Sequence, residues 1–403
     1  MPESADQSTS TLTEKDLSAW ATLARFREAL AIARKDFPDH RSFSDPKRLL
    51  ELGDYLCLFL LGLLNPIARS MRGLIQASRL PKVQREICTR KVSLGSFSET
   101  QSLVDVALLE RVFADLSAQL PDRAGVPAAL RTQRWMARDS SLFAALPRMT
   151  WALYGGGREG CLNNAVRLHV SLDLKKDSPS AVQITPGKKC ERAALRENLV
   201  PGDAYIGDRY YGEHHAFFTL LSRRGNRYLI RLLDRGMEPT ILEELPVSEA
   251  DKAAGIQRQA MVRLGKNDTL SEVLRHIWLR GINGQELLLV TNLRAGELSA
   301  ADAALLYQHR WQIEYFFRWL KCLMGCGHWL AESQTGAGIQ LYLALIGAVL
   351  LELDLGRRPS KRVWELLQWY LSGTIGHETL AELLKAQLTS EEYARARRNK
   401  KRR

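Results

Sequence analysis

Hydrophobic and polar positions follow a helical period over the first third of the chain. Between residues 17 and 120, apolar side chains recur every three or four positions, as in SAWATLARFREALAIARKDF (18–37), which is typical of amphipathic helices that share a core. A more apolar run, YLCLFLLGLL (55–64), predicts a buried helix, because it is shorter than the ~18–20 apolar residues of a membrane span. Residues 1–15 are rich in Ser, Thr and Glu and predict a disordered N-terminus.

After Pro127 the pattern changes to short β-type runs. The expected elements are strands at 134–143, 167–174 and 180–186, a helix at 188–200, a strand at 204–211, a helix at 213–225 and a strand at 227–233. Short connections make the first three strands antiparallel neighbours, whereas the fourth strand follows a helical crossover and should run parallel to one of them. This order of elements is the one expected of a ribonuclease-H-like (RNase H-like) α/β core.

Further strands are predicted at 255–264, 274–282 and 286–293, and a long helix follows Ser299. We interpret 234–293 as a β-strand insertion into the core. Two more helical runs occupy 338–355 and 363–373, and the chain ends in the basic tail ARARRNKKRR. The predicted fold class is therefore α/β: an RNase H-like mixed sheet with a β insertion, preceded by an all-α domain and followed by C-terminal helices.

The charge of the chain favours a polyanionic partner. Lys and Arg number 57 against 45 Asp and Glu, a formal net charge of +12, while 45% hydrophobic residues exclude wholesale disorder. The run SMRGLIQASRLPKVQREICTRKVS (70–93) is basic and helical, and could equally contact phosphates or form a solvated helix face. Six scattered cysteines are typical of reduced thiols in a cytoplasmic protein.

Neither a membrane nor a nucleotide partner is expected. The second apolar run, LYLALIGAVLL (341–351), is again too short for a membrane span and predicts a buried helix. Gly155-Gly156-Gly157 lacks the Lys-Ser/Thr that follows a phosphate-binding glycine loop, so it predicts a turn.

The most informative helix is the one after Ser299. It carries Tyr307, Arg310, Glu314 and Lys321, at separations of 3, 4 and 7 residues. At ~100° per residue these positions fall within roughly 60° of one another, so a single continuous helix would present them as one stripe. A polar stripe is also an ordinary feature of a surface helix. One carboxylate among cations and a phenol nevertheless suits a place where metal ions and phosphates meet.

The spacing Tyr-x2-Arg-x3-Glu-x6-Lys in YQHRWQIEYFFRWLK (307–321) resembles the signature of DDE transposases of bacterial insertion sequences, specifically insertion-sequence family four. IGDRYY (206–211) is similar to the family's second-acid motif, and RDSSLFAALPRMTWALY (138–154) to its first-acid region. The resemblance covers roughly residues 90–355.

The resemblance implies three acids. Asp208 is the second, at the end of the fourth core strand, and Glu314 is the third. Asp139 is favoured as the first, because Asp139-Ser140-Ser141 resembles the family's Asp-Gly-Ser/Thr pattern with Ser140 in place of Gly. Asp173 is the competitor, although it would end an antiparallel strand at the opposite edge from Asp208.

The resemblance to this family also implies an activity. Asp139, Asp208 and Glu314 would be the catalytic acids and would bind two Mg²⁺ ions, with Mn²⁺ as a substitute. Arg310 and Lys321 would contact DNA phosphates, and Tyr307 would donate a hydrogen bond to one. The expected reaction is cleavage at transposon ends and strand transfer into target DNA by a cut-and-paste route. The partners are then double-stranded DNA, as terminal inverted repeats and target, and a second copy of the chain in a synaptic homodimer, in the nucleoid of a bacterial cytoplasm.

The resemblance also divides the chain into regions. These are a disordered N-terminus (1–15), a helical DNA-binding domain (16–130), the catalytic core (131–233 and 294–330), the β insertion (234–293), a C-terminal helical region (331–393) and the basic tail (394–403).

Two other functions stay open from the sequence alone. An inactive, element-derived DNA-binding regulator would be expected to have lost at least one acid, yet all three positions have candidates. An RNase H-like nuclease without strand transfer would keep all three, so only a strand-joining assay separates it from a transposase.

Overall fold

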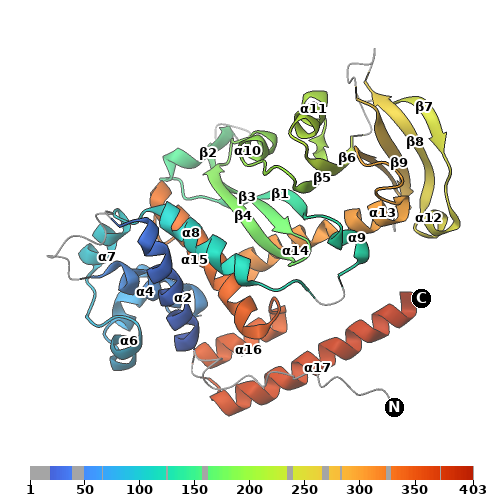
Figure 1. Ribbon diagram of the computed structural model, residues 1–403. Helices are drawn as coiled ribbons and strands as arrows, with labels where there is room; N and C mark the ends of the chain where they lie inside the picture. The colour runs from blue at the N-terminus through green and yellow to red at the C-terminus, as the bar shows by residue number, and fades with distance from the viewer. Residues whose placement is uncertain are drawn as a thin grey trace, which may run out of the picture. The chain divides into compact units, whose positions relative to one another are not determined.

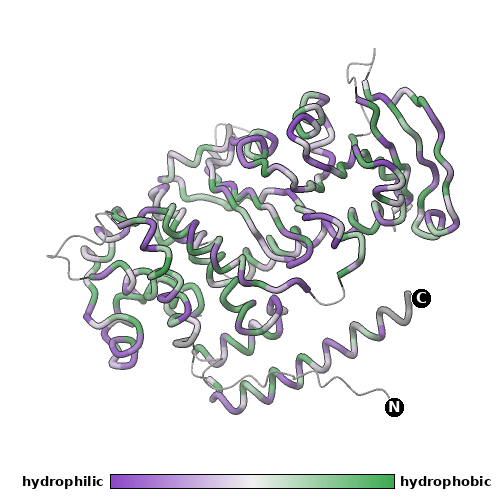
Figure 2. Tube along the Cα trace, viewed as in Figure 1, coloured by the Kyte–Doolittle hydropathy of each residue, from purple (hydrophilic) through white to green (hydrophobic). Residues whose placement is uncertain are grey.

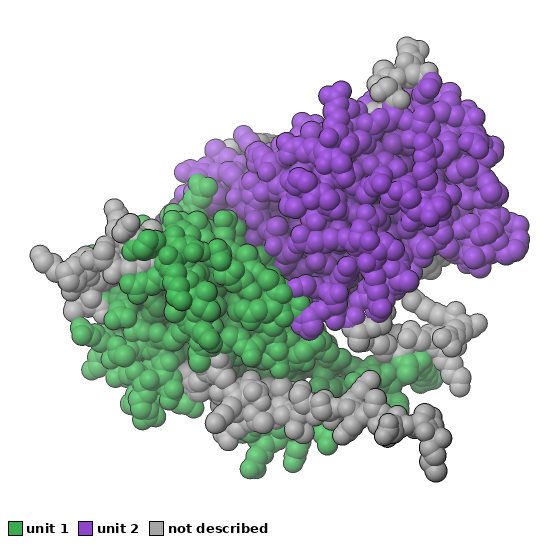
Figure 3. Space-filling model, viewed as in Figure 1, with its two compact units in different colours: residues 1–120, 319–403 green, residues 121–318 purple. Residues whose placement is uncertain are grey.

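The computed structural model describes residues 19–38, 50–65, 67–123, 126–156, 162–233, 239–265, 272–281, 284–323, 328–372 and 374–402. The predicted disordered N-terminus and Gly157 lie outside these residues. The chain divides into two compact units, shown in different colours in Figure 3. One comprises residues 1–120 with 319–403, and the other comprises residues 121–318.

The first unit is helical. Its helices are α2 (Ala19–Ala33), the 3-10 turn η1 (Arg34–Asp36), α4 (Leu52–Leu64), α5 (Met71–Ala77), α6 (Pro81–Glu86), α7 (Leu94–Gln101), α8 (Val106–Gln119), α15 (Gln334–Leu355), α16 (Lys361–Leu371) and α17 (His377–Arg402), with the end of α14 (Trp311–Leu323). The unit thus joins helices from both ends of the chain, which the sequence prediction separates into two regions. The physical reason is a shared core, because α15 packs against α8, α4 and α2.

Helix α15 is the central apolar element of this unit (Figure 2). Among the described residues it is the one helix long and apolar enough to cross a membrane, but 94% of its most apolar window is buried inside the structure. Tyr342 donates a hydrogen bond to Glu110 (2.5 Å) from within it. A Cβ added at Gly336, near its start, would come within 2.3 Å of the Gln101 amide nitrogen. These contacts identify α15 as a core helix, as the sequence predicts.

The basic C-terminal tail is part of a helix. Helix α17 continues to Arg402, whereas the sequence suggests a separate tail from residue 394. Within the same unit, Glu391 accepts hydrogen bonds from Arg357 (2.7 Å) and Ser360 (2.6 Å). These bonds tie α17 to the start of α16 and favour the helical conformation at the point where the basic residues begin.

The second unit is built on a sheet that has ten strands among the described residues. The strands are β1 (Trp135–Ala144), β2 (Leu153–Gly156), β3 (Leu162–Asp173), β4 (Ser178–Pro186), β5 (Ala204–Gly212), β6 (Arg227–Leu232), β7 (Pro239–Leu245), β8 (Ile256–Leu264), β9 (Leu274–Arg280) and β10 (Glu286–Thr291). Its helices are α9 (Ala128–Arg131), η2 (Thr150–Ala152), α10 (Glu191–Glu197), α11 (His215–Arg223), α12 (Glu249–Ala253) and α13 (Ala300–His309), followed by most of α14. The strand order is β2-β3-β1-β5-β6-β10-β9-β8-β7, and β4 also pairs with β3.

The strand pairing confirms the predicted fold class. β1 and β4 both pair with β3 in antiparallel fashion, whereas β5 pairs in parallel with β1 and with β6. The resulting order β4-β3-β1-β5-β6 is that of an RNase H-like core. The insertion strands continue this sheet, because β10 pairs with β6 in antiparallel fashion (Figure 1).

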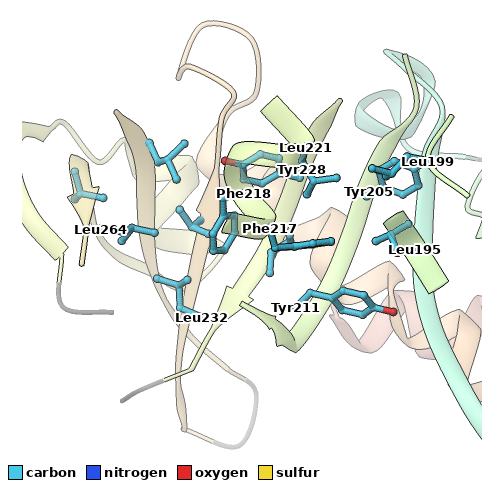
Figure 4. Packing of buried hydrophobic residues seen from close by; sticks show 14 of the residues in the cluster. Leu195, Leu199, Tyr205, Tyr211, Phe217, Phe218, Leu221, Tyr228, Leu232 and Leu264 are labelled. Carbon is cyan, nitrogen blue, oxygen red and sulfur yellow. The ribbon is translucent and has the colours of Figure 1, made fainter. Parts of the chain in front are cut away.

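Helices α10 and α11 cover one face of the core sheet (Figure 1). Figure 4 shows their buried side chains, among them Leu195 and Phe217, packed against Tyr205 and Tyr228 of the strands. Side chains alternate along a strand, so Met136 and Tyr205 face these helices, and the next paired residues, Ala137 and Ile206, point to the opposite face.

Replacing Phe217 by Ala should strongly destabilise the sheet-bearing unit. The ring is fully buried and lies with its centroid 5.8 Å from that of Tyr211. Removing it leaves a cavity and is expected to cost about 3–5 kcal/mol in the free energy of unfolding, measured by urea denaturation. Leu242→Ala on β7, where the side chain is 45% exposed, is the matched control and should change it by less than about 0.5 kcal/mol. Equal effects of the two substitutions would contradict the packing described here.

Candidate active site

Two aspartates lie just beyond the point where the parallel strands β1 and β5 stop pairing. The last paired residues are Ala137 and Ile206, and Asp139 and Asp208 each follow two residues later. The two acids are near enough that the negative charge of Asp208 helps to raise the pKa of Asp139. The pairing of these two strands stops at Ala137, so the carboxylates lie where the strands are free to separate.

Local hydrogen bonds hold both aspartates. Asp139 Oδ1 accepts from the backbone N–H of Ser140 (2.7 Å), and Asp208 Oδ1 accepts from that of Tyr210 (3.0 Å). Each bond uses one oxygen. Asp139 also lies 3.7 Å, through its Oδ2, from Nη1 of Arg310, the residue between α13 and α14.

Arg310 links two of the three predicted acids. Its Nη2 donates to Glu314 Oε1 (2.8 Å), and its Nη1 lies 3.7 Å from Asp139 Oδ2. The Arg310 side chain is only 7% exposed, against 20% for Asp139 and 32% for Glu314. One buried guanidinium therefore brings a strand acid and a helix acid together.

The helix that carries the signature is broken at Arg310. α13 ends at His309 and α14 begins at Trp311, with the Arg310 N–H donating to the Tyr307 carbonyl (3.2 Å) in a tightened turn. The sequence pattern predicts one continuous helix here, whereas the structure divides it into α13 and α14 at one residue, Arg310, whose backbone keeps helical dihedral angles (φ −52°, ψ −33°). The break places the side chains of Tyr307 and Trp311 around the Arg310 guanidinium, with ring centroids 5.6 and 5.5 Å from its central carbon.

The other predicted site residues differ in their surroundings. Tyr307 is buried, and burial raises the pKa of its phenol. Lys321 is exposed on α14, seven residues after Glu314, and belongs to the helical unit.

Asp173, the competing first acid, lies at the other end of β1. It stands opposite Met136, where its carboxylate pairs with Arg134 (3.5 Å) and accepts from the Lys175 N–H (2.9 Å). The structure thus separates Asp173 from Asp208 and brings Asp139 beside it.

A fourth carboxylate, which the sequence did not indicate, lies next to the aspartates. Glu191 is the first residue of α10, and its Oε1 accepts from Ser140 Oγ (2.6 Å) and Arg167 Nη1 (2.7 Å). The Glu191 and Arg167 side chains are 16% and 14% exposed. The only local signal is an acidic residue in the first turn of a predicted helix, which is too common to mark a site.

The acids influence one another's protonation. Burial raises the pKa of Asp139 to about 7, the negative charges of Glu191 and Asp208 raise it as well, and the Ser140 N–H and Arg310 act in the opposite direction. Burial also raises the pKa of Glu191, and Asp208 adds to that increase. Crowded carboxylates with a raised pKa form a site where added positive charge is favourable.

The donor set fits a divalent cation. Carboxylate oxygens are the ligands that Mg²⁺ and Mn²⁺ prefer, and the like-charge crowding around Asp139 is what such a cation relieves. Among the described residues, no three His, Cys, Asp or Glu side chains are already arranged around a common metal position, and Arg310 stands between Asp139 and Glu314.

An RNase H-like sheet with carboxylates just beyond the pairing of its central parallel strands is typical of enzymes that act on the phosphodiester bonds of nucleic acids. The family model described as the transposase DDE domain matches residues 134–350, more than half of the chain. The protein belongs to this family, which confirms the predicted resemblance to DDE transposases and implies the use of a divalent metal.

Three curated proteins that are described as transposases are similar in sequence to this chain. A protein described as transposase y4zB of Sinorhizobium fredii is 28% identical over 252 residues, 62% of this chain and 67% of its own length. One described as a transposase for insertion sequence element IS4SA of Synechocystis is 32% identical over 271 residues, which cover 65% of this chain and 72% of the relative. One described as a transposase for IS5377 of Geobacillus stearothermophilus is 27% identical over 216 residues, 51% of this chain and only about half (52%) of the relative.

The alignment with a solved structure, the piggyBac transposase synaptic complex with hairpin DNA, covers 93% of this chain and 83% of the chain in that structure. The TM-score is 0.42 and the sequence identity 10%, a likeness too low to carry an argument.

Proposed function

We propose that the protein is a cut-and-paste DNA transposase in which Asp139, Asp208 and Glu314 hold two Mg²⁺ ions, with Mn²⁺ as a substitute. The observation that carries the proposal is the contact of one buried guanidinium with two of the acids. Arg310 contacts Asp139 and Glu314, and Asp139 and Asp208 each follow the last paired residues of β1 and β5. Membership in the transposase family supplies the class of reaction.

The acids and their neighbours have separate roles in this proposal. When bound, a pair of divalent cations activates an attacking oxygen and stabilises the leaving oxygen of a phosphodiester displacement. Asp139 and Asp208 supply oxygen ligands from the rigid sheet, and Glu314 supplies one from α14. Water as the nucleophile releases the transposon end, and the freed 3′-hydroxyl then joins that end to target DNA.

Arg310 has a donor left over for DNA. Its Nε is buried and has no hydrogen-bond partner among the described residues, although Nη1 and Nη2 face the acids. A buried, unsatisfied N–H is costly, and a phosphate oxygen would satisfy it with a charge-assisted bond. Tyr307 would donate its hydroxyl to a phosphate, and Lys321 would add positive charge along the strand.

The complete signature at residues 307–321 supports a place in insertion-sequence family four. The DNA partners are then the terminal inverted repeats and the target. Cutting two ends together requires two active sites, so the active form would be a homodimer on DNA, acting in the nucleoid of a bacterial cytoplasm. The basic end of α17 would add salt-sensitive affinity for any DNA sequence.

A reconstituted reaction tests the proposal. The full chain is incubated with duplexes that carry the inverted repeats flanking its gene, with a supercoiled target plasmid, and with Mg²⁺ or EDTA. We expect cleavage at the repeat ends and joined products in Mg²⁺, and neither in EDTA. Binding without cleavage would indicate a regulator instead, and cleavage without joining would indicate a nuclease.

The pH dependence of cleavage reports on Asp139. Since its pKa lies at about 7, this carboxyl is protonated at lower pH and then binds metal poorly, so cleavage at limiting Mg²⁺ should fall as the pH drops through 7. Glu191→Gln removes a negative charge that raises this pKa, and should move the midpoint of the pH–rate profile to lower pH. Glu197→Gln, at the exposed end of the same helix, is the control and should leave the midpoint in place. A midpoint that stays or rises in Glu191→Gln would contradict this coupling.

A further inference from the structure

Among the described residues, the strand segment that carries Asp208 has no ladder partner on either side. β5 pairs with β1 as far as Ile206 and with β6 as far as Gly207, and its pairing with β6 resumes only at Gly212. A segment without ladder hydrogen bonds shifts easily unless other contacts hold it. Carboxylates that share a cation must be held to within ~0.5 Å, so this segment needs a support outside the sheet.

Asp139 stands on a more rigid segment. β1 pairs with β3 without interruption from Met136 to Ala144, so that ladder holds the residues on both sides of Asp139. Towards β5, in contrast, the paired part of β1 ends at Ala137. The sheet therefore fixes Asp139 but does not by itself fix its separation from Asp208.

Arg192, the second residue of α10, holds the Asp208 segment. Its Nη1 donates to the backbone carbonyl of Tyr210 (2.8 Å) and to Glu213 Oε2 (2.7 Å), and its guanidinium lies 4.4 Å from the centroid of the Tyr210 ring. The Arg192 side chain is only 13% exposed. Since the N–H of Tyr210 is the donor to Asp208 Oδ1 (3.0 Å), the arginine fixes the residue that orients this carboxylate.

Glu191, the preceding residue, makes the corresponding contact with the Asp139 segment. It accepts from Ser140 Oγ (2.6 Å), and the Ser140 N–H is the donor to Asp139 Oδ1 (2.7 Å). In both cases a side chain of α10 contacts the residue whose backbone N–H bonds the acid. Glu191 and Arg192 thus form a support that connects β1 and β5 beyond the end of their pairing.

Helix α10 is itself anchored on the paired part of these strands. Leu195 is 1% exposed and belongs to the same buried cluster as Met136 of β1 and Tyr205 of β5 (Figure 4). Met136 and Tyr205 are partners in the parallel ladder. The support is therefore fixed where the two strands are hydrogen-bonded and acts where they are not.

We propose that Arg192 is a positioning residue, which holds the Tyr210 peptide to α10 and so sets the separation of Asp208 from Asp139 that a shared pair of cations requires. The inference rests on the proposed function and adds a supporting residue to it. Removing a group that orients a metal ligand typically changes metal affinity 10–100-fold. In this role Arg192 acts through Tyr210 and contacts neither the cations nor DNA.

The test measures Mn²⁺ binding, from the electron paramagnetic resonance signal of free Mn²⁺, to the full chain on a pre-cleaved transposon-end duplex that lacks the terminal 3′-hydroxyl and cannot react. Arg192→Ala should weaken Mn²⁺ binding about tenfold. Losing a positive charge near the acids would by itself strengthen cation binding, so a loss of affinity identifies positioning as the cause. Arg192→Lys keeps the charge and an N–H donor and should recover part of the affinity. Arg196→Ala, at an exposed arginine of the same helix, is the matched control and should bind Mn²⁺ like the unaltered protein.

Ser140→Ala tests the other end of the support without changing a charge. It removes the hydroxyl that contacts Glu191 and keeps the backbone donor to Asp139, and it should also weaken Mn²⁺ binding. The double variant Ser140→Ala/Arg192→Ala should lose less affinity than the product of the two single losses, because a support released at one end no longer connects the strands. Losses that multiply would contradict a single support.

Failure of this inference is distinguishable from failure of the proposed function. If Asp208→Asn abolishes Mn²⁺ binding but Arg192→Ala binds Mn²⁺ as tightly as the unaltered protein, or more tightly, the positioning role is disproved and the transposase function stands. If Mn²⁺ binding by the unaltered protein does not depend on Asp208, the proposed metal site falls and the positioning role falls with it.

Discussion

Glu314→Gln should abolish Mg²⁺-dependent cleavage, by on the order of a thousandfold or more, and leave DNA binding almost unchanged. The amide has the shape of the carboxylate, and its oxygen can still accept the hydrogen bond from Arg310 Nη2 (2.8 Å in the unaltered protein). What is lost is the negative charge that a divalent cation requires. The rate of end cleavage in Mg²⁺ measures the loss of catalysis, and the affinity for the same duplex in EDTA measures any loss of DNA binding.

Two further variants sharpen this result. Asp208→Asn should be as inactive as Glu314→Gln, because the two acids serve the same cations. Glu249→Gln makes the same chemical change at an 89%-exposed side chain on α12 and should cleave normally. Cleavage at an unaltered rate by Glu314→Gln or Asp208→Asn would remove that acid from the site.

Arg310→Ala should destabilise the metal-free protein by about 3–5 kcal/mol. The guanidinium is buried and lies between Asp139 and Glu314, so its removal leaves two carboxylates close together without a counter-charge. A divalent cation supplies that charge. Much of the lost stability should therefore return in Mg²⁺, and the melting temperature of Arg310→Ala should rise more on adding Mg²⁺ than that of the unaltered protein does.

Arg310→Lys is the matched variant for this experiment. It keeps one positive charge but lacks the fork that reaches both acids, so its loss of stability in EDTA should be smaller than that of Arg310→Ala. Thermal unfolding of the three proteins, with and without Mg²⁺, provides the comparison. An equal loss in EDTA and in Mg²⁺ would show that Arg310 acts by packing alone and that no cation enters between the acids.

The sheet and its two aspartates could be predicted from the sequence because their positions depend on local patterns. Strand lengths and short connections fix the antiparallel pairs, and the helical crossover fixes the parallel pairing of β1 with β5. Asp139 and Asp208 each follow the segment in which β1 pairs with β5, so the topology alone places both just beyond that pairing. Edge strand β7 escaped the prediction because it is largely exposed and lacks an alternating pattern.

Other parts of the site depend on tertiary packing. The break at Arg310 involves neither proline nor glycine, and the side chain there is held by acids from β1 and α14. Glu191 belongs to the site only because α10 folds back onto the end of β1, where Ser140 and Arg167 meet its carboxylate. Neither the contacts of Arg310 nor those of Glu191 produce a recognisable pattern in the sequence around these residues.

Anomalous diffraction from a Mn²⁺-bound complex of the protein with a transposon-end duplex tests the central claim most directly. We expect two Mn²⁺ peaks about 3.5–4 Å apart, bound by carboxylate oxygens of Asp139, Asp208 and Glu314. Ordered Mn²⁺ held by other residues, with no cation between Asp139 and Asp208, would contradict it.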